Sequence, residues 1–328
     1  MITDIVLGIQ HGDEGKGKVT HHLLKNGDYT HCIRFNGGCN AGHTIFHNDK
    51  KFVTHHIPAS VFFGIPAIIG PGCVVNIDKF LKELNYLAEN GIDIENNVKI
   101  ARNAHIITKE HVTEDSKDYK IGTTKSGNGP AYRDKFHRSG VRAENVPLLA
   151  PFIVDMQEEL YGGEESVILM EGAQGFWLDV DWGDYPFVTS SNCGVGAAIN
   201  NGIDPRSIRN VWGVAKVYET YVGMKKFQPE DKIFETIQKA GSEFGATTGR
   251  VRQCNWLDFE KLTRAIRMNG VNKLIFNKVD VLREVKSWGM KNPDAFFADG
   301  EDGFMKFITD NAPECVDEIF FSASPKTI

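Results

Sequence analysis

The chain has 328 residues, is 41% hydrophobic and 24% charged, and carries a formal net charge of −6 at pH 7. This length allows one large α/β domain or two smaller ones, and the acidic balance argues against general nucleic-acid binding, which usually requires a basic face. The sequence has no apolar run of membrane-spanning length, no basic and apolar leader, and no Cys-x-x-Cys pair among its six cysteines. We therefore expect a cytoplasmic protein with reduced thiols and without membrane or nucleic-acid partners.

The first predicted elements are a strand, a glycine-rich loop and a helix. The apolar run Asp4–Gln10 leads into Gly12–Lys18, and Val19–Leu24 is typical of the first turns of a helix. Backbone N–H groups freed by glycine, the helix N-terminus and lysine charge together bind phosphate. The loop matches G-x-x-x-x-G-K-[ST] until its last position, where Val19 replaces Ser or Thr. Because carboxylates repel phosphate, we interpret Asp13 within this loop as a metal ligand, a base, or both.

A second strand is predicted at His31–Phe35 and is followed by a flexible loop that ends in Asn40-Ala-Gly-His-Thr44. Glycines and asparagines around a single histidine give the backbone unusual freedom. A histidine presented in this way is more often a functional donor than a core residue. Further along, Ile77–Asn90 has the apolar spacing of a helix that ends at Gly91.

The segment Gly122–Ala131 is predicted to be a loop that binds a monophosphate through hydroxyls and backbone amides. Arg133, Lys135, Arg138 and Arg142 follow it closely. Two interpretations stay open at this point: a solvated basic face, or one or two guanidinium groups that pair with the phosphate.

Polar segments follow the next predicted strand. We expect a helix at Pro151–Tyr161 and a buried strand at Ser166–Met170, which runs into Glu171–Gly175. Tyr185–Asn192 supplies more polar residues, and Asn210–Val217 is predicted to be a further strand. Polar residues directly after buried parallel strands lie where open α/β sheets bind ligands.

Two signals for small-molecule recognition lie in the last third of the chain. Gly245–Arg252 is a Gly/Thr loop with two arginines that could clamp a carboxylate. After a helix at Leu257–Met268, the strand Lys273–Phe276 runs into Asn277-Lys-Val-Asp280, the guanine-reading signature of GTP-binding proteins. The aspartate accepts hydrogen bonds that adenine cannot supply, so such a site discriminates well. A last strand is expected at Glu318–Phe321.

Together these motifs resemble the adenylosuccinate synthetase family, which joins aspartate to IMP while splitting GTP. The resemblance rests on the following blocks in register: Gly12 to Lys18, Asn40 to Thr44, Ile121 to Thr124, Gly129 to Tyr132, Glu171 to Gly175, Tyr185 to Asn192, Phe244 to Arg250 and Lys278 to Asp280. It implies one α/β domain over residues 1–328, with a central, largely parallel (mixed) sheet flanked by helices and a P-loop-like nucleotide site. It also implies a homodimer.

The resemblance further implies roles for individual residues. Asp13, His43 and Lys16 would be catalytic, and Asp13 and Gly42 would hold Mg²⁺. GTP, the co-substrate, would contact Gly12, Glu14, Gly15, Lys16, Gly17, Lys18, Thr44, Arg252, Lys278, Val279, Asp280, Ser322, Ala323 and Ser324. The acceptor nucleotide would contact Asn40, Ala41, Thr123, Thr124, Arg138, Gln174, Thr189 and Arg250, with Arg138 supplied by the second subunit. L-Aspartate would contact Ala246, Thr247, Thr248, Gly249, Arg250 and Arg252.

The chain departs from the family pattern at several points. It is shorter than typical bacterial members and resembles the compact archaeal and viral-type members. Tyr221 stands where the family usually has arginine, Lys125 replaces a glycine, and the loop Arg250-Val-Arg-Gln253 has fewer arginines than usual. These differences leave the acceptor open between IMP and dGMP, although retention of Asp13 favours IMP.

The sequence therefore predicts a GTP- and Mg²⁺-dependent ligase that makes adenylosuccinate from IMP and L-aspartate. The first alternative is a viral-type enzyme that uses dGMP and makes 2-aminoadenylosuccinate. The second is a GTP-binding switch protein, against which the missing Ser/Thr at Val19 counts. An inactive homologue is disfavoured because Asp13, Lys16, His43 and Arg250 are all present.

Overall fold

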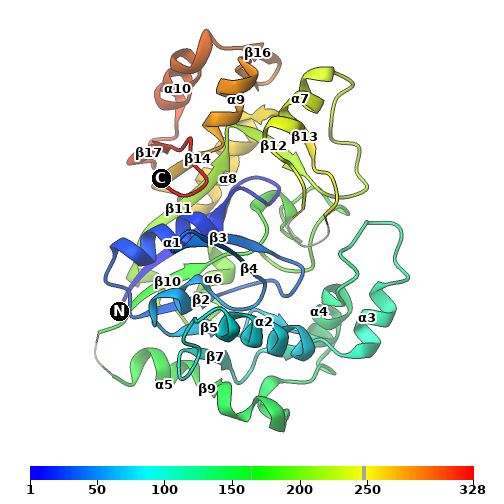
Figure 1. Ribbon diagram of the computed structural model, residues 1–328, viewed down its shortest axis with the longest axis vertical. Coiled ribbons are helices and arrows are strands. Elements are labelled where there is room, and N and C mark those ends of the chain that lie inside the picture. The colour runs from blue at the N-terminus through cyan, green and yellow to red at the C-terminus, as the bar shows by residue number, and fades with distance from the viewer. Residues whose placement is uncertain (164, 246–248) are drawn as a thin grey trace.

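The computed structural model describes residues 1–163, 165–245 and 249–328, and a nine-stranded sheet forms its centre (Figure 1). In order across the sheet, the strands are β17 (Glu318–Phe321), β14 (Lys273–Asn277), β11 (Ile208–Lys216), β1 (Ile2–Gly8), β10 (Val167–Glu171), β2 (His31–Arg34), β5 (Ala67–Ile69), β7 (Val98–Ala101) and β9 (Ile153–Val154). Every neighbouring pair is parallel. The predicted α/β class with a central parallel sheet is confirmed.

Antiparallel pairing occurs in smaller sheets that the sequence did not reveal. A four-stranded sheet contains β12 (Tyr218–Tyr221), β13 (Gln253–Asp258), β15 (Gly289–Lys291) and β16 (Ala295–Phe297). The strands β3 (His43–His47) and β4 (Lys50–Thr54) form an antiparallel hairpin, whereas β6 (Val74–Val75) and β8 (His105–Ile106) form a small parallel pair. The predicted strand at 210–217 is therefore followed almost at once by a second strand in another sheet.

The described α-helices are α1 (Lys16–Asn26), α2 (Ile77–Glu89), α3 (Lys109–Asp115), α4 (Asn128–His137), α5 (Met156–Tyr161), α6 (Val195–Ile199), α7 (Lys232–Ala240), α8 (Phe259–Asn269), α9 (Val279–Val285) and α10 (Gly300–Asn311). Short 3₁₀ helices lie at Ala59–Phe63, Ala143–Asn145, Pro147–Phe152, Phe176–Leu178 and Pro205–Ser207. No helix in the described part of the chain is both long and apolar enough to cross a membrane.

Helix capping explains where the predicted helix boundaries were confirmed and where they were wrong. Asn76 caps α2, which confirms the helix predicted at 77–90. The helix predicted at 151–161 was wrong in its first half, because α5 begins only after Asp155, whose side chain accepts a hydrogen bond from the Gln157 N–H. Likewise α8 begins after the capping residue Asp258, two residues later than predicted.

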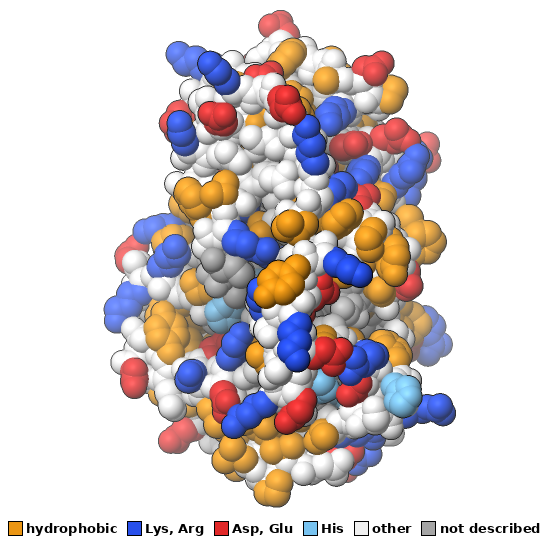
Figure 2. Space-filling model, turned by 90° about the vertical axis from the view of Figure 1, so that its right-hand side faces the viewer, with side chains coloured by type: hydrophobic (Ala, Val, Ile, Leu, Met, Phe, Trp, Pro, Cys, Tyr) orange, Lys and Arg blue, Asp and Glu red, His pale blue; other side chains and the backbone are white. Residues whose placement is uncertain are grey.

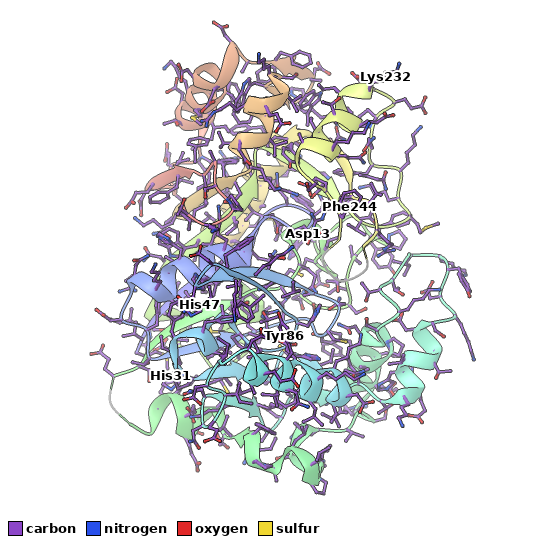
Figure 3. The ribbon with its side chains drawn as sticks, viewed as in Figure 1. Asp13, His31, His47, Tyr86, Lys232 and Phe244 are labelled. Atoms are coloured by element: carbon purple, nitrogen blue, oxygen red, sulfur yellow. The ribbon has the colours of Figure 1, made fainter. Side chains whose placement is uncertain are left out.

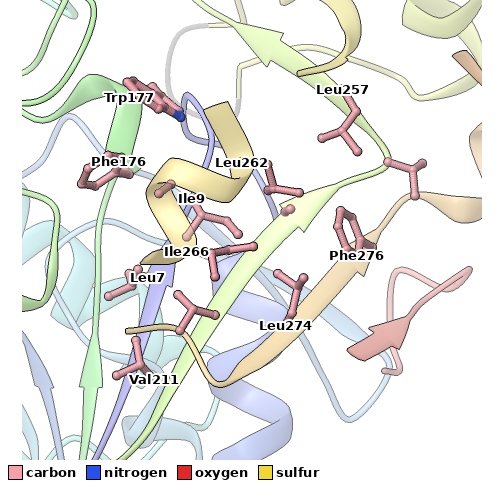
Figure 4. Packing of buried hydrophobic residues seen from close by; sticks show 14 of the residues in the cluster. Leu7, Ile9, Phe176, Trp177, Val211, Leu257, Leu262, Ile266, Leu274 and Phe276 are labelled. Atoms are coloured by element: carbon pink, nitrogen blue, oxygen red, sulfur yellow. The ribbon is translucent and has the colours of Figure 1, made fainter. Parts of the chain in front are cut away.

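Two of the three hydrophobic clusters in the described part of the chain share the residues of β1 between them. Ile5 and Leu7 belong to the first cluster, whereas Val6 between them belongs to the second. Because successive side chains of a strand point to opposite faces, this alternation shows that both faces of the sheet are covered. Figure 4 shows Leu7 and Ile9 of the first cluster packed near Leu262, from α8. Burial on both faces explains why the central strands are almost continuously apolar.

The parallel strands position the functional loops. The segments that follow β1, β2, β10, β11 and β14 all start at the carboxyl edge of the same sheet. The four-stranded sheet lies at one end of the molecule together with α7, α9 and α10. The other end contains α3, α4 and α5 (Figure 1). On the face shown in Figure 2, basic and acidic side chains are interspersed. The site lies between these two ends.

Candidate active site

The loops at the carboxyl edge of the sheet enclose a cavity of about 610 Å³. Most of the residues predicted to bind substrates line it: Gly12, Asp13, Glu14, Gly15, Lys16, Gly17, Lys18, Asn40, Ala41, Gly42, His43, Thr44, Thr123, Thr124, Gln174, Thr189, Arg250, Arg252, Lys278, Asp280 and Ser324. One cavity therefore brings together residues from eight separate stretches of the sequence.

The loop after β1 has the geometry of a phosphate-binding loop, although its charged residues are partly engaged with one another. Gly12, Asp13 and Gly15 have positive φ angles of 88°, 60° and 95°, and α1 begins at Lys16 directly after them. The buried Glu14 carboxylate accepts from the Gly12 N–H at 2.8 Å and from Lys16 Nζ at 2.5 Å. Glu14 thus braces the loop from inside and keeps Lys16 close to it.

Glycine is required at position 17 for a different reason from Gly12 and Gly15, which have positive φ angles. A Cβ at this position would lie 3.0 Å from the Cβ of His43 and 3.2 Å from the Thr44 carbonyl oxygen. The absence of a side chain therefore lets α1 approach β3 closely. This approach brings His43 next to the phosphate loop.

Asp13 is the exposed carboxylate of the loop and begins a chain of alternating charges. Its Oδ2 lies 2.7 Å from Arg252 Nε, and Arg252 Nη1 lies 2.7 Å from Glu243 Oε2. Glu243 Oε1 in turn lies 3.1 Å from Lys216 Nζ. Figure 3 labels Asp13 on the loop after β1 and Phe244, which follows Glu243 in the sequence. The chain of charges joins the phosphate loop to the segment predicted to bind aspartate.

The charge of Glu243 is maintained in a fully buried position. Burial on its own would raise the pKa of this carboxyl, but Lys216 and Arg252 outweigh burial and hold the pKa at about 2. Burial conversely lowers the pKa of Lys216, while Glu243 acts in the opposite direction. We therefore assign Glu243 and Lys216 as an ionised pair at neutral pH.

Three side-chain amides, from Asn40, Asn128 and Gln174, meet at the wall of the cavity. Asn40 Oδ1 accepts hydrogen bonds from Asn128 Nδ2 at 2.7 Å and from Gln174 Nε2 at 3.1 Å. Gln174 Oε1 is buried and has no hydrogen-bond partner among the described residues. This cluster leaves an acceptor atom that can receive a hydrogen bond from a bound molecule. Asn128 was not singled out, although it lies in the segment Gly122–Ala131 that was predicted to be a monophosphate-binding loop; the structure instead begins α4 at this residue.

His43 lies in a buried ionic cluster beside the phosphate loop. Its Nδ1 contacts Glu171 Oε1, and Arg34 Nη2 lies 2.6 Å from the same oxygen. Burial lowers the pKa of His43 to about 4, Arg34 contributes in the same direction, and Glu171 opposes them. Burial on its own would raise the pKa of Glu171, but Arg34 and His43 hold it at about 2.

The predicted guanine-reading segment also borders the cavity. Asp280, in the first turn of α9, is exposed and lines the cavity together with Lys278. Asn277 instead braces the phosphate loop, because its Nδ2 donates to the Glu14 carbonyl oxygen at 2.7 Å. Asp280 is therefore the member of the motif that is available to a nucleobase.

Lys18 ties α1 to the last residues of the chain. Its Nζ donates to Ser322 Oγ at 2.7 Å and to the carbonyl oxygens of Ser324 and Thr327 at 2.9 and 3.1 Å. Burial lowers the pKa of Lys18 to about 8, an effect that Asp280 opposes and Lys278 reinforces. The predicted Ser322–Ser324 turn is thereby held against the nucleotide site.

A few predicted site residues lie elsewhere. Val279 and Ser322 are buried, and Ala323, Gly249 and Arg138 are exposed; these five are not among the lining residues of the cavity. Arg138 follows α4 with a φ of 70°. Ala246, Thr247 and Thr248, predicted to bind aspartate, lie outside the described residues.

The structure also brings in residues that the sequence did not single out as ligands. Lys216 at the end of β11 and Tyr221 at the end of β12 both line the cavity. A lysine that ends a strongly apolar strand was a usable signal, because a buried lysine needs a charged partner. The partner, Glu243, is 27 residues away and could not be identified from spacing.

Oxygen donors suited to Mg²⁺ are present. In the described part of the chain, no group of three or more His, Cys, Asp or Glu side chains is arranged to hold a metal ion. Mg²⁺, however, commonly takes one or two protein oxygens and completes its shell with substrate phosphates and water. The Asp13 carboxylate and the backbone of Gly42 line the same cavity. The residues present therefore fit a Mg²⁺ ion shared with a bound nucleotide.

Known proteins resemble this chain over most of its length. A family model described as adenylosuccinate synthetase matches residues 5–148 and 144–291. The adenylosuccinate synthetase of Thermodesulfovibrio yellowstonii is 38% identical, with 86% of this chain and 78% of that protein covered. The protein of the same name from Endomicrobium trichonymphae is 37% identical, with 87% and 78% covered.

Solved structures give the same picture. The fully ligated adenylosuccinate synthetase from Plasmodium falciparum matches with a TM-score of 0.84 and 26% identity, covering 98% of this chain and 97% of that one. The succinoaminodeoxyadenylate synthetase of cyanophage S-2L, bound to dGMP and dATP, matches with a TM-score of 0.76 and 19% identity, covering 99% and 93%. At this lower identity the likeness shows a common fold alone.

Proposed function

The chain belongs to the adenylosuccinate synthetase family and is a C–N ligase of purine biosynthesis that binds GTP, and we propose that it joins L-aspartate to IMP through a 6-phosphoryl-IMP intermediate. In the first step the purine 6-oxygen attacks the γ-phosphorus of GTP and GDP leaves. In the second step the aspartate amine attacks C6 of the purine and inorganic phosphate leaves. The products are adenylosuccinate, GDP and phosphate.

Asp13 acts as the base of the first step. It takes the N1 proton of the purine, so that negative charge builds on the 6-oxygen and makes it a nucleophile. Its position supports this role, because it is the loop carboxylate that faces the cavity, whereas Glu14 is occupied by Gly12 and Lys16. For this step the Asp13 carboxylate has to exchange its contact with Arg252 for the substrate.

Mg²⁺ would be held by Asp13 and the Gly42 carbonyl together with nucleotide phosphates, and when bound it supplies neutralisation of phosphate charge. Lys16 at the end of the phosphate loop and His43 beside that loop stabilise the charge of the γ-phosphoryl group as it moves. Phosphoryl transfer needs positioned charge rather than a protein nucleophile. The buried, ordered surroundings of His43 support such a role.

GTP lies along the phosphate loop with its base at Asp280 and its phosphates at the N-terminus of α1. The exposed carboxylate of Asp280 accepts from the guanine ring N–H and amine, and the tail held by Lys18 covers this end of the site. The acceptor nucleotide lies at the opposite end, near the amide cluster of Asn40, Asn128 and Gln174.

L-Aspartate is recognised by the segment between these two sites. Arg250 and Arg252 line the cavity and have the fork geometry that pairs with carboxylates. Arg138 is exposed outside the cavity in one chain, and we place it in the acceptor site of a partner subunit in a homodimer. Residues 1–328 then act as one catalytic unit, and a cytoplasmic location agrees with the free thiols in the described part of the chain.

The proposal rests on one observation above the others: Asp13, His43 and Asp280, predicted as base, charge stabiliser and guanine reader, line the same cavity. The test is a coupled assay with L-aspartate, Mg²⁺ and GTP that compares IMP and dGMP as acceptors and follows product absorbance. Turnover with IMP supports the proposal. Turnover with dGMP alone would replace IMP by the acceptor of the viral-type alternative. The switch-protein alternative is set aside, because the chain belongs to a ligase family.

A further inference from the structure

We propose that Glu171 is a positioning residue for His43: its carboxylate fixes the ring orientation and keeps the hydrogen on Nδ1, so that Nε2 is the nitrogen left for the substrate. The effect on turnover rests on the function proposed above. The effect on the imidazole ring does not, and the two can be measured separately.

Glu171 is held in place by the central sheet. It is the last residue of β10, and in the parallel register it pairs with Arg34, the last residue of β2. The two side chains therefore lie side by side at the sheet edge, with Arg34 Nη2 2.6 Å from Glu171 Oε1. The second oxygen accepts from the Ala59 N–H at 2.9 Å. A carboxylate fixed from two sides on a rigid sheet is a stable reference point for a ring on a hairpin.

The contacts of His43 Nδ1 determine which nitrogen carries the hydrogen. Nδ1 contacts Glu171 Oε1 and also lies 3.1 Å from Arg34 Nη2. Arginine can only donate and an ionised carboxylate can only accept, so Nδ1 cannot satisfy both. The contact with Glu171 is the shorter one, and Arg34 Nη2 already donates to Glu171. The hydrogen therefore lies on Nδ1 and is donated to Glu171.

This assignment leaves Nε2 as the free nitrogen of the ring. Nε2 is buried and has no hydrogen-bond partner among the described residues. A buried polar atom without a partner is costly unless a ligand or water satisfies it. His43 lines the cavity beside Lys16, where the transferred phosphoryl group is expected. The arrangement of carboxylate, Nδ1–H and open Nε2 parallels the orienting carboxylate of other catalytic histidines.

Glu171→Gln tests the inference because it removes the carboxylate charge and keeps the size of the side chain. The amide can present an N–H to Nδ1, which would move the ring hydrogen to Nε2. We expect kcat to fall by about 10²- to 10⁴-fold, the range seen when an orienting carboxylate is lost, with the KM values for IMP and GTP nearly unchanged. Because Arg34 would lose its charge partner, Arg34→Met/Glu171→Gln provides a second variant in which both buried charges are removed.

The control is Glu83→Gln, which changes another buried carboxylate outside the site. Glu83 accepts hydrogen bonds from the backbone N–H groups of His55, His56 and Ile57, each at 3.0 Å. We expect this variant to lower stability without a change in kcat. If Glu83→Gln and Glu171→Gln reduce kcat equally, Glu171 has a structural role alone and the inference is wrong.

A double variant separates action through His43 from a direct effect. In a His43→Asn background, Glu171→Gln should cause less than about a twofold further loss, because residues that act as one unit are not additive. An equal loss in both backgrounds would overturn the inference. If the His43→Asn background has no measurable turnover, the decision passes to the spectroscopic measurement.

That measurement is the long-range ¹H–¹⁵N spectrum of ¹⁵N-histidine-labelled protein without substrate, with the His43 signals assigned from their loss in His43→Asn. The wild type should show the Nδ1–H tautomer, and Glu171→Gln should show Nε2–H or a mixture. An unchanged tautomer would overturn the inference even if turnover falls. Wild-type protein that shows the Nδ1–H tautomer but no turnover with IMP, GTP and aspartate would instead refute the proposed function and leave the positioning intact.

Discussion

Glu243→Gln should destabilise the protein strongly, because it breaks the buried chain of alternating charges that starts at Asp13. The Glu243 carboxylate is fully buried and contacts Arg252 Nη1 at 2.7 Å, Lys216 Nζ at 3.1 Å and the Tyr218 hydroxyl at 2.5 Å. The amide keeps one acceptor oxygen but not the charge. Lys216, which is 1% exposed, is then a buried cation whose remaining side-chain partner is the Thr220 hydroxyl at 2.6 Å.

The expected loss follows from the burial of the pair. Removing one partner of a buried ion pair costs about 3–5 kcal/mol, and the retained acceptor oxygen places this variant near the lower value. A loss of about 3 kcal/mol corresponds to a decrease in Tm of roughly 4 °C for a chain of this size. The KM for L-aspartate should also rise, because Arg252 loses one of the two carboxylates that hold it in place.

The assay is urea unfolding of wild type and variant at several pH values, with KM measured in parallel. The pKa of Glu243 is about 2 in the fold and about 4.5 in the unfolded chain. Its charge therefore stabilises the fold fully above pH 4.5, and this contribution disappears as the pH falls toward 2. The difference between wild type and variant should be constant above about pH 5 and shrink below it.

The neutral pair Lys216→Met/Glu243→Gln decides whether the charges are the cause. Replacing both partners of a buried pair is often nearly neutral, so this variant should regain most of the lost stability. A loss below about 1 kcal/mol in the single variant, or an equal loss in the double variant, would refute the reasoning. In that case the segment with Arg252 would be held by other contacts.

Four further outcomes are expected. Asp13→Ala should lower kcat by about 10³-fold or more in the coupled assay, with an unchanged melting curve, because its side chain is partly exposed; retained turnover would refute its role as base. Asp280→Asn should reduce the preference for GTP over ATP in kcat/KM, and an unchanged preference would remove the guanine assignment. Arg138→Leu should raise the KM for IMP, and mixing with Asp13→Ala subunits should restore activity if the site is shared between subunits; no rescue would place the arginine in its own chain's site. Urea midpoints should fall as the pH drops from about 6.5 toward 4, because burial lowers the pKa of His43 to about 4 and that of His56 to about 3, so that the unfolded chain binds protons the fold does not; a constant midpoint would contradict this.

The sequence was most informative where a site depends on local chemistry. Glycine at positions of positive φ, lysines at a helix start and Asp280 after a strand are features of neighbouring residues, and the two segments predicted from them line one cavity. The parallel sheet was predicted from apolar strands that are followed directly by polar residues. In each case the physical cause lies within a few residues of the motif.

Secondary structure was predicted less well where tertiary packing outweighs the local preference of the sequence. The segment after Gly127 has the glycine and proline content of a loop, yet it forms α4, because tertiary packing of Ala131 and Tyr132 outweighs local propensity. The same applies to the helix expected at 151–161, which gives way to the edge strand β9. That strand pairs with β7, some fifty residues earlier in the chain.

What the sequence could not supply is the partner of each charged side chain. In the phosphate loop, three charged residues have different contacts. Lys16 is paired inside the loop with Glu14, Lys18 holds the C-terminal residues, and Asp13 faces the cavity. A motif defines which residue types are present, but whether a charge meets a ligand or another side chain depends on what the fold brings next to it. The contact of Lys18 with Ser322 joins residues 304 positions apart. Ser322→Ala removes one of the three acceptors that hold Lys18 Nζ, so it should change GTP binding although Ser322 itself is not among the residues that line the cavity.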